Sequence, residues 1–212
     1  MGKRKKIDGV LLLDKPAGIS SNQALQQARW LYQAEKAGHG GTLDPFATGL
    51  LPVLFGEASK FGRYFLDGDK AYEATLAFGT ETDTGDLSGA VIREAAPPPL
   101  DAVDWAALCA GFSGVQRQVP PVYSALKVGG ERAYALARRG ELPQLEAREV
   151  VIHELRFLGM DGDGARFFVR CSKGTYIRSL LRDMAAALGS AGHTRALRRV
   201  AVAGLTAMTP LA

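Results

Sequence analysis

The chain has 212 residues, of which 47% are apolar and 23% charged, and its formal net charge is +4. This length can bury the core of one substantial domain or two small ones, and the composition excludes a disordered chain. The mild basic excess fits a polyanionic partner without establishing one. Cys109 and Cys171 lie far apart in no paired motif, so we expect no disulfide and a reducing, cytoplasmic location.

The N-terminal part predicts a buried strand. The run from Gly9 to Asp14 is apolar and is closed by Lys15 and Pro16, which favour a turn. Its apolar centre is too short for a signal peptide, and nothing elsewhere approaches a membrane span. We therefore expect a soluble protein.

A helix and an irregular loop are predicted next. Ser20 and Gln23 have the spacing of a capping box, and Ala24, Ala28 and Leu31 then fall on one helical face. The Gly-rich stretch GHGGTLDPFATG fits neither the helical nor the strand period. We expect a loop there, and loops that a rigid scaffold holds often carry catalytic residues.

The middle of the chain changes between strand and helix patterns. Residues Tyr72 to Phe78 alternate with period two and predict a strand, and Val91 to Arg93 predict another. After a Pro-rich break at 97–99, Trp105, Leu108, Cys109 and Phe112 have helical spacing. We favour one domain spanning 1–212 with a local insertion around 97–145, and a domain boundary at the break is the alternative.

The C-terminal part predicts a hairpin followed by a helix. Val150 to Leu158 and Arg166 to Cys171 are strand-like runs on either side of a Gly-rich turn. Ile177 to Leu188 has helical spacing, with Gly189 as the stop signal. The spacing of a doubly wound fold is missing, and so are the GxGxxG and GxxxxGK[ST] motifs. The predicted fold class is α+β, with a mixed, largely antiparallel sheet and flanking helices.

The sequence offers little support for a metal site or a nucleophilic triad. The three histidines, His39, His153 and His193, are isolated, neither cysteine has a neighbour at ligand spacing, and no GxSxG motif occurs. The stretch DTGDLSG, which begins at Asp83, fails three required positions of a calcium loop. We interpret it as a solvated turn and expect no metal.

Several side chains have both a functional and an ordinary interpretation. Asp44 lies between glycines and Pro45, where backbone can approach a ligand, or it caps a short helix that starts at Pro45. Tyr176 and Arg178 stand at a strand-to-helix junction, where they can serve an anion or a carboxylate, or are an interfacial tyrosine and a surface arginine. Tyr72, taken alone, is typical of a core residue.

Basic residues gather near both ends of the chain. Lys3 to Lys6 and the arginines Arg195, Arg198 and Arg199 can contact phosphates. A frayed tail and a solvated face are the ordinary alternatives for these two groups.

Five segments, taken in order, resemble one family. GVLLLDKPAGISSNQ, KAGHGGTLDPFATGLLPVLFGEASKF, DKAYEATLAFGTETDTGD, PPVYSALKVGGERAYALAR and CSKGTYIRSLLRDMAAALG are similar to the tRNA pseudouridine-55 synthase (TruB) family over nearly the whole chain. The resemblance implies the pseudouridine synthase fold. It also implies an isomerase that converts uridine-55 in the T-loop of tRNA to pseudouridine.

The resemblance also implies a role for individual residues. Asp44 matches the catalytic aspartate of the GTLDP motif, Arg178 matches the arginine that pairs with it, and Tyr72 matches a tyrosine that stacks on the target base and takes part in proton transfer at C5. The implied substrate-binding residues are His39, which stacks against RNA bases, Tyr72, which stacks on the target base, and Tyr176 and Leu197, which line the uridine pocket. Lys15 and Pro16 are implied to support the active-site loop, and Lys60 to face phosphate.

Such a reaction breaks the N1 glycosidic bond, rotates the base and rejoins it through C5, so we expect no cofactor. Whether Asp44 adds covalently or removes a sugar proton stays open. The bond is inaccessible in a stacked loop, so the nucleotide must flip out. The expected partner is the T-arm of tRNA, and the chain is expected to be a monomer without an obligate protein partner or a membrane. The alternatives are a non-catalytic tRNA chaperone or RNA-binding module, and a relative that works on guide-RNA complexes.

The chain departs from the family pattern at three places. Gly40 is the second residue of the family's HTG triplet, and Gly192 precedes His193 where alanine is commoner. Family members usually continue into a small C-terminal RNA-binding domain. We expect that domain to be absent here, because the sequence ends at Ala212.

Overall fold

The computed structural model describes residues 4–124, 126–141 and 143–211, so Lys3 of the basic N-terminal run lies outside the described part. The chain divides into two compact units. Unit 1 comprises Met1–Glu73, Arg170–Lys173 and Ala196–Ala212, and unit 2 comprises Ala74–Val169 and Gly174–Arg195. Three strands supply residues to both units, namely β4 (Lys70–Phe78), β11 (Gly164–Cys171) and β12 (Gly192–Val202).

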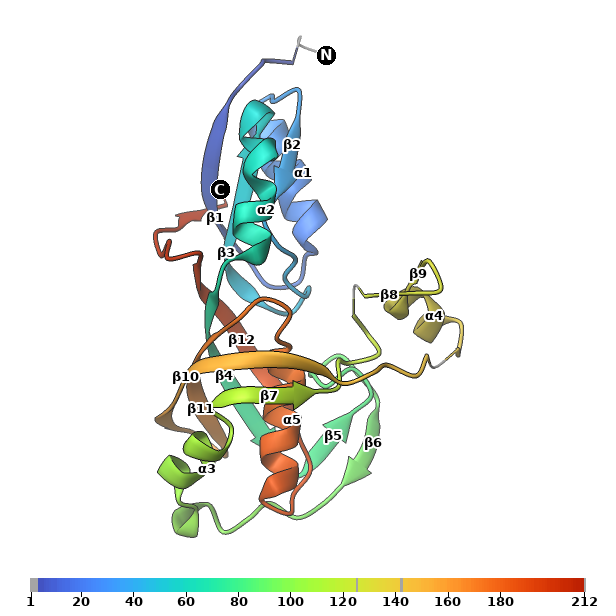
Figure 1. The fold of residues 1–212 in the computed structure, drawn as a ribbon, viewed down its shortest axis with the longest axis vertical. Coiled ribbons are helices and arrows are strands. Elements are labelled where there is room, and N and C mark those ends of the chain that lie inside the picture. The colour runs from blue at the N-terminus through green and yellow to red at the C-terminus, as the bar shows by residue number, and fades with distance from the viewer. Residues whose placement is uncertain (1–3, 125, 142, 212) are drawn as a thin grey trace. The chain divides into compact units, whose positions relative to one another are not determined.

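Unit 1 is built from a few short elements (Figure 1). They are β1 (Gly9–Lys15), α1 (Ser21–Leu31), β2 (Ala37–His39), β3 (Thr48–Phe55), the 3-10 helix η1 (Gly56–Phe61), α2 (Gly62–Asp67) and β13 (Thr209–Pro210). In the described chain the main sheet has the order β13-β1-β3-β12-β4-β11-β10-β7, with β2 paired to β3. Strand β1 is antiparallel to β3, whereas β12 is parallel to β3.

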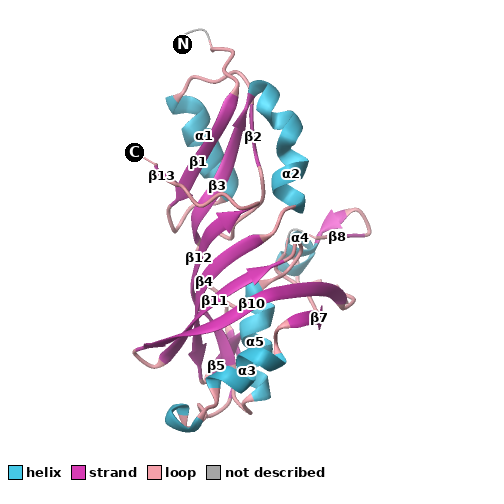
Figure 2. Cartoon of the chain, turned by 60° about the vertical axis from the view of Figure 1, so that its left-hand side comes forward, coloured by secondary structure: helices cyan, strands magenta, loops and turns pink. Residues whose placement is uncertain are grey.

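Strand β3 is apolar along almost its whole length because helices cover both of its faces. Leu51, Val53 and Phe55 pack with Ala24, Leu25 and Ala28 of α1. Leu50 and Leu54 point the other way and pack with Phe65 of α2 and with Val202. Figure 2 shows α1 and α2 on opposite sides of these strands. A strand that is buried on both faces needs no polar alternation, so the run LLPVLF has no period of two.

Helix α1 begins as its sequence predicts. The Ser20 hydroxyl accepts a hydrogen bond from the backbone N–H of Gln23, and the Gln23 side chain accepts one from the Ser20 N–H. This capping box satisfies N–H groups that the first helical turn leaves without partners. The helix therefore starts directly after the turn that follows β1.

Unit 2 holds the remaining elements. They are β5 (Thr80–Thr82), β6 (Val91–Glu94), the 3-10 helix η2 (Leu100–Ala102), α3 (Trp105–Gly111), β7 (Gly114–Gln118), β8 (Lys127–Val128), β9 (Glu131–Arg132), α4 (Ala133–Arg138), β10 (Arg148–Asp161) and α5 (Ile177–Ala187). Strand β7 is antiparallel to β10 in the main sheet. The pairs β5-β6 and β8-β9 form separate two-stranded sheets.

An aromatic cluster anchors α3 in unit 2. The Trp105 ring stacks on Phe157 of β10 with centroids 4.5 Å apart and planes 7° apart, and it meets Phe167 of β11 edge-on. Aromatic pairs of this kind stabilise a core beyond the area that they bury. The helix predicted from the spacing of Trp105, Leu108 and Cys109 is thereby confirmed.

The structure confirms the predicted fold class, a mixed and largely antiparallel sheet with helices against it. Cys109 and Cys171 are both buried, and neither belongs to a disulfide in the described part of the chain. One boundary differs: β10 continues through Gly159 to Asp161, and the hairpin turns at Gly162, whose φ is +63°. Part of the 97–145 region, β7, belongs to the main sheet. Among the described residues, no helix is long and apolar enough to cross a membrane.

Candidate active site

Asp44 lies in a loop between β2 and β3, which we call the Asp44 loop and define as residues 40–47. No helix starts at Pro45, so the interpretation of Asp44 as a helix cap is wrong. The Ala47 N–H donates to the Asp44 carbonyl in a single turn, and the chain then enters β3 at Thr48. The strand pairs with β1 and β12, which leaves no room for a helix to continue.

Hydrogen bonds from three other segments hold the backbone on both sides of Asp44. The Ser21 hydroxyl donates to the Leu43 carbonyl at 2.9 Å and accepts from the Leu43 N–H at 2.7 Å. The Pro45 carbonyl accepts from the Gly18 N–H at 2.9 Å and from the Lys15 ammonium at 3.3 Å. Because its two neighbours are fixed, the half-buried Asp44 is held in a defined place.

Lys15 is completely buried and uses its ammonium group inside the fold. Its Nζ also donates to the carbonyls of Pro16 at 2.7 Å and Ile19 at 2.8 Å, so its three donors match three acceptors. Burial lowers the pKa of Lys15 to about 8, and the Asp44 carboxylate opposes that shift. Lys15 therefore supports the loop and lies within electrostatic reach of Asp44.

The three C-terminal arginines are all engaged within the protein. Arg199 is 1% exposed, and its guanidinium donates to the carbonyls of Gly41, Thr42 and Leu50. Its interpretation as a phosphate contact or part of a solvated face is therefore wrong. Arg198 forms a bidentate pair with Asp14 at 2.7 and 2.9 Å. Arg195 pairs with Asp163 at 2.6 Å.

Tyr72 and His39 lie near the same buried arginine in unit 1. Burial raises the pKa of Tyr72 to about 12, although the positive charge of Arg199 opposes the shift. The pKa of His39 is lowered, first by burial and then by the positive charge of Arg199. The His39 Nδ1 is buried and has no hydrogen-bond partner among the described residues. At neutral pH both rings are therefore uncharged.

The other proposed ligands in unit 1 vary in exposure. Leu197 is buried, whereas Pro16 is exposed. Lys60 is exposed and forms an ion pair with Glu57. Lys5 of the basic run is held by backbone bonds, since its N–H donates to Gln33 and its carbonyl accepts from Glu35. The tail is thus not frayed at this residue.

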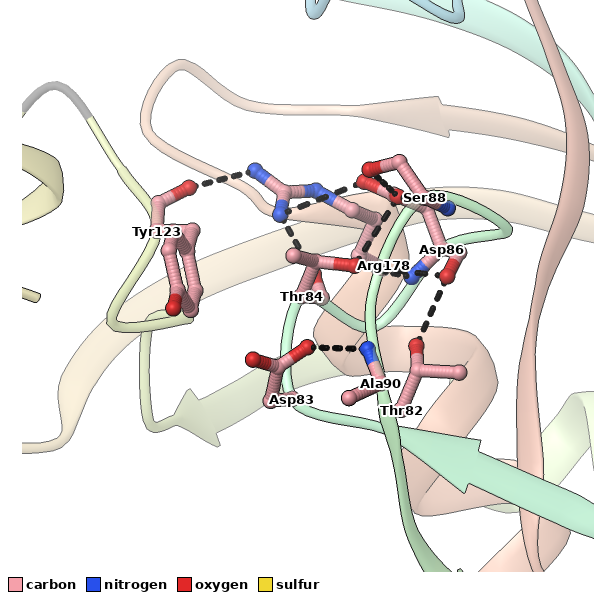
Figure 3. A network of polar contacts seen from close by, with 8 residues as sticks. All are labelled: Thr82, Asp83, Thr84, Asp86, Ser88, Ala90, Tyr123 and Arg178. Carbon is pink, nitrogen blue, oxygen red and sulfur yellow. Dashed lines mark hydrogen bonds and ion pairs between the residues drawn. The ribbon is translucent and has the colours of Figure 1, made fainter. Parts of the chain in front are cut away.

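Unit 2 contains a second polar site around Arg178, the second residue of α5 (Figure 3). Arg178 is 3% exposed, so its interpretation as a surface arginine is wrong. Its guanidinium donates to the carbonyls of Thr84 at 2.5 Å and Tyr123 at 2.8 Å, and it faces the Asp86 carboxylate at 3.7 Å. A buried arginine of this kind is fixed in position by its acceptors.

The loop at residues 82–90 is correspondingly not a solvated turn, which corrects the expectation for this segment. Asp86 is 4% exposed, and its Oδ1 accepts from the Thr84 hydroxyl and the Ser88 N–H, both at 2.9 Å (Figure 3). The Asp86 carbonyl accepts from the Thr82 hydroxyl at 2.7 Å. The sequence signal that could have indicated this network is a hydroxyl residue two positions before and another two positions after Asp86.

Tyr176 is held through its backbone at the N-terminus of α5. The Gln118 side chain accepts from the Tyr176 N–H at 2.7 Å and donates to the Tyr176 carbonyl at 3.0 Å. Gln118 is buried at the end of β7, and no feature of its sequence neighbourhood pointed to this contact. Ser21 and Asp86 were likewise missed. The pairing of Asp44 with Arg178 stays a prediction, because the two belong to different units.

Residues 29–177 match the family model for TruB family pseudouridylate synthase, N terminal domain. The chain belongs to this family. Relatives named tRNA pseudouridine synthase B are similar throughout: the one from Chromohalobacter salexigens is 54% identical over 203 residues, and the one from Chromobacterium violaceum is 54% identical over 204 residues. These matches cover 94% and 96% of this chain but 66% of each relative.

Solved structures agree with this membership of the TruB family. The chain resembles one from a Cbf5-Nop10-Gar1 complex with a TM-score of 0.69 and 29% identity, covering 92% of this chain and 48% of the other. It resembles one from an H/ACA RNP bound to a substrate RNA containing 2'-deoxyuridine with a TM-score of 0.70 and 26% identity, covering 96% and 51%.

The two glycines that depart from the TruB family motifs are tightly packed. A Cβ on Gly40 would lie 2.5 Å from the Cβ of Phe65, and a Cβ on Gly192 would lie 2.5 Å from the Cβ of Ala185. Such distances are shorter than side chains tolerate. In this TruB family member, the close approach of α2 to residue 40 and of α5 to residue 192 thus accounts for both glycines.

Proposed function

We propose that this chain isomerises uridine-55 in the T-loop of tRNA to pseudouridine, with Asp44 as its catalytic residue. Membership of the TruB family supports the reaction class. The observation that carries the assignment to Asp44 is the double clamp on its neighbours, Leu43 and Pro45. A carboxylate that must meet one atom of a flipped nucleotide gains from such preorganisation.

The chemistry balances without a co-reactant. The N1–C1′ bond breaks, a C5–C1′ bond forms, and the proton of C5 is replaced by one on N1. Asp44 acts on the sugar or the base, and the positive charge of Lys15 favours its ionised form. Tyr72 keeps its phenolic proton at neutral pH because its pKa is about 12. It can therefore give this proton to N1 and then take the proton of C5, which restores the phenol.

Arg178 supplies the second part of the proposed site. The family resemblance implies that this arginine pairs with the catalytic aspartate, and the carbonyls of Thr84 and Tyr123 fix its guanidinium. The resemblance also implies that Tyr176 and Leu197 take part in binding the uridine. The Gln118 amide supports this role by holding the Tyr176 backbone from both sides.

The proposed substrate is the T-arm of tRNA, with the target nucleotide flipped out of its stack. His39, whose ring is uncharged and half-buried, is suited to stack on an RNA base. Exposed Lys60 faces phosphate. We propose that the chain acts as a monomer and needs no metal. In the described residues, no group of three or more histidine, cysteine or acidic side chains lies together.

The test is direct detection of product. Unmodified, prefolded tRNA is incubated with the purified chain, digested, and mapped for pseudouridine, with Asp44→Asn as the inactive control. Pseudouridine at position 55 of tRNA treated with the wild-type chain, and none in tRNA treated with Asp44→Asn, supports the proposal. tRNA refolding without any pseudouridine indicates the alternative, a tRNA chaperone. Product that appears only when a guide RNA is added indicates the guide-dependent alternative.

A further inference from the structure

The start of α5 carries two residues of the proposed site, and it has no capping side chain of its own. Tyr176 is the N-cap of the helix, but tyrosine is not among the residues that cap helices well, and its side chain makes no cap hydrogen bond. The first N–H groups of a helix have no partner within the helix. Hydrogen bonds that hold this end of α5 must therefore come from another segment.

Gln118, which lies 58 residues before Tyr176, supplies such bonds. Its amide oxygen accepts from the Tyr176 N–H at 2.7 Å, and its amide nitrogen donates to the Tyr176 carbonyl at 3.0 Å. The same carbonyl accepts the first bond of the helix, from the Leu180 N–H at 3.1 Å. One side chain thus binds both backbone groups of the residue at which α5 starts.

The main sheet fixes Gln118 in turn. Gln118 is the last residue of β7, and its backbone lies opposite Arg148 of β10 in the antiparallel pair. The residue is only 4% exposed, so its side chain is confined by its surroundings. The amide therefore ties the start of α5 to the end of a strand in the main sheet.

Two more hydrogen bonds join the same part of the chain, the 118–123 segment, to the first turn of α5. The Ser179 hydroxyl donates to the Val119 carbonyl at 2.8 Å, and the Arg178 guanidinium donates to the Tyr123 carbonyl at 2.8 Å (Figure 3). Two consecutive prolines lie between these acceptors and restrict the backbone of the segment. The segment and the helix are thus joined at three points, of which Gln118 is the one anchored in the sheet.

We propose that Gln118 is a positioning residue for pseudouridine formation, whose amide holds the first turn of α5 and thereby places Tyr176 and Arg178. Gln118 acts through the Tyr176 backbone and not on the uridine. The kinetic consequence rests on the proposed function, whereas the hold on α5 does not.

The kinetic test compares Gln118→Met, which keeps the length of the side chain but loses both bonds, with Gln116→Met. Gln116 lies on the same strand, and its amide donates to the carbonyls of Gly111 and Ser113 at the end of α3. We expect Gln118→Met to lower the single-turnover rate about 100-fold, because misplaced groups are costly at a reacting centre. The tRNA Kd should change by less than about threefold, because phosphate contacts supply most of the affinity. Gln116→Met should react at a nearly normal rate.

Three kinetic results would overturn the proposal. The first is a normal rate in Gln118→Met, and the second is an equal loss of rate in Gln116→Met. The third is a loss of tRNA affinity as large as the loss of rate, which is what general damage to the RNA-binding surface would produce.

A second measurement needs neither activity nor a folded variant. An N-cap N–H ordinarily exchanges with solvent quickly, but the bond to Gln118 predicts that the Tyr176 N–H of the wild-type chain is as protected as the N–H groups of Leu180 and Leu181. Hydrogen exchange followed residue by residue by NMR measures this. In Gln118→Met, exchange should accelerate at Tyr176 more than at Leu181, and in Gln116→Met it should not.

Fast exchange at Tyr176 in the wild-type chain would overturn the hold on α5, and so would equal acceleration along the whole helix in Gln118→Met. If the wild-type chain makes no pseudouridine, the proposed function fails, while protection at Tyr176 still decides whether Gln118 holds the helix.

Discussion

Two irregular loops, the Asp44 loop in unit 1 and the 82–90 loop in unit 2, are both held by hydrogen bonds, but the bonds reach different groups. Each is contacted by a buried arginine from a distant segment: Arg199 binds carbonyls of the first, and Arg178 binds a carbonyl of the second. Asp86 turns inward and accepts bonds from its own loop. Asp44 is instead held through its neighbours, Leu43 and Pro45.

The difference concerns which groups in each loop receive the bonds. Oδ1 of Asp86 accepts hydrogen bonds that shape its own loop, whereas Oδ2 faces the Arg178 guanidinium at 3.7 Å. The clamps around Asp44 are made to backbone groups of its neighbours, which fixes its position through the main chain. These bonds therefore reach the side chain of Asp86 and the main chain on both sides of Asp44, which we propose as the catalytic residue.

The largest expected effect tests this comparison at Asp44 itself. Asp44→Asn keeps the shape but removes the charge, so we expect turnover to fall by several orders of magnitude with tRNA binding retained. Single-turnover pseudouridine formation and filter binding measure the two quantities. Substantial pseudouridine formation by the purified variant would show that Asp44 has a structural role and not a catalytic one.

The next largest effect is expected for Arg178→Lys. Lysine keeps the charge but loses the planar fork that bonds to Thr84 and Tyr123, so the single-turnover rate should fall on the order of 100-fold. The control is Arg182→Lys, on the same helix, which pairs with Asp183 near the surface. Weaker tRNA binding with normal chemistry would indicate that Arg178 serves a phosphate.

Alanine substitutions at two adjacent serines distinguish the effect of losing the loop contact from the effect of losing the helix cap. Ser21→Ala leaves the Leu43 N–H and carbonyl without their partner, so we expect a loss of about 1–3 kcal/mol in the free energy of unfolding and a lower rate. Ser20→Ala removes the cap of α1, at about 1 kcal/mol, and should leave the rate nearly normal. Chemical denaturation and single-turnover rates distinguish them. Equal rates in the two variants would show that the Ser21 clamp has no part in catalysis.

The smallest effect concerns pH and Lys15. Its pKa is about 8 in the folded chain against an ordinary 10.5, so the unfolded chain binds more protons between these values. The free energy of unfolding should therefore rise with pH over that window, and it should rise less steeply in Lys15→Met. Urea denaturation at about pH 7 and about pH 10 measures the slopes, with exposed Lys36→Met as the control. Parallel slopes for Lys15→Met and wild type would contradict this.

Local patterns predicted much of the fold from the sequence. The capping box at Ser20, the alternation from Tyr72 and the helical spacing from Ile177 each correspond to an observed element. Strand β3 was missed because burial on both faces removes its alternation. Strand β12 was also missed, and its arginines were considered only as phosphate contacts or as part of a solvated face.

The site was only partly predictable from the sequence, because several of its contacts join residues that are far apart in the chain. Asp44 stands out locally between glycines and a proline, but Ser21, Asp86 and Gln118 act through tertiary contacts that no spacing encodes. Arg199 looked like a basic surface residue, since composition does not reveal which arginines the fold surrounds with carbonyls. The family motifs marked which positions matter, whereas the contacts explain how they are held.

The placement of β3 between two helices also bears on how the nascent chain avoids aggregation. An exposed LLPVLF run would present apolar side chains on both of its faces. Helix α1 is synthesised before this strand, and α2 is complete with the twelve residues from Gly56 to Asp67 that follow it. At typical ribosomal speeds that interval lasts about one or two seconds. This apolar segment of unit 1 is thus followed almost at once by the second helix that packs on it, before unit 2 has left the ribosome.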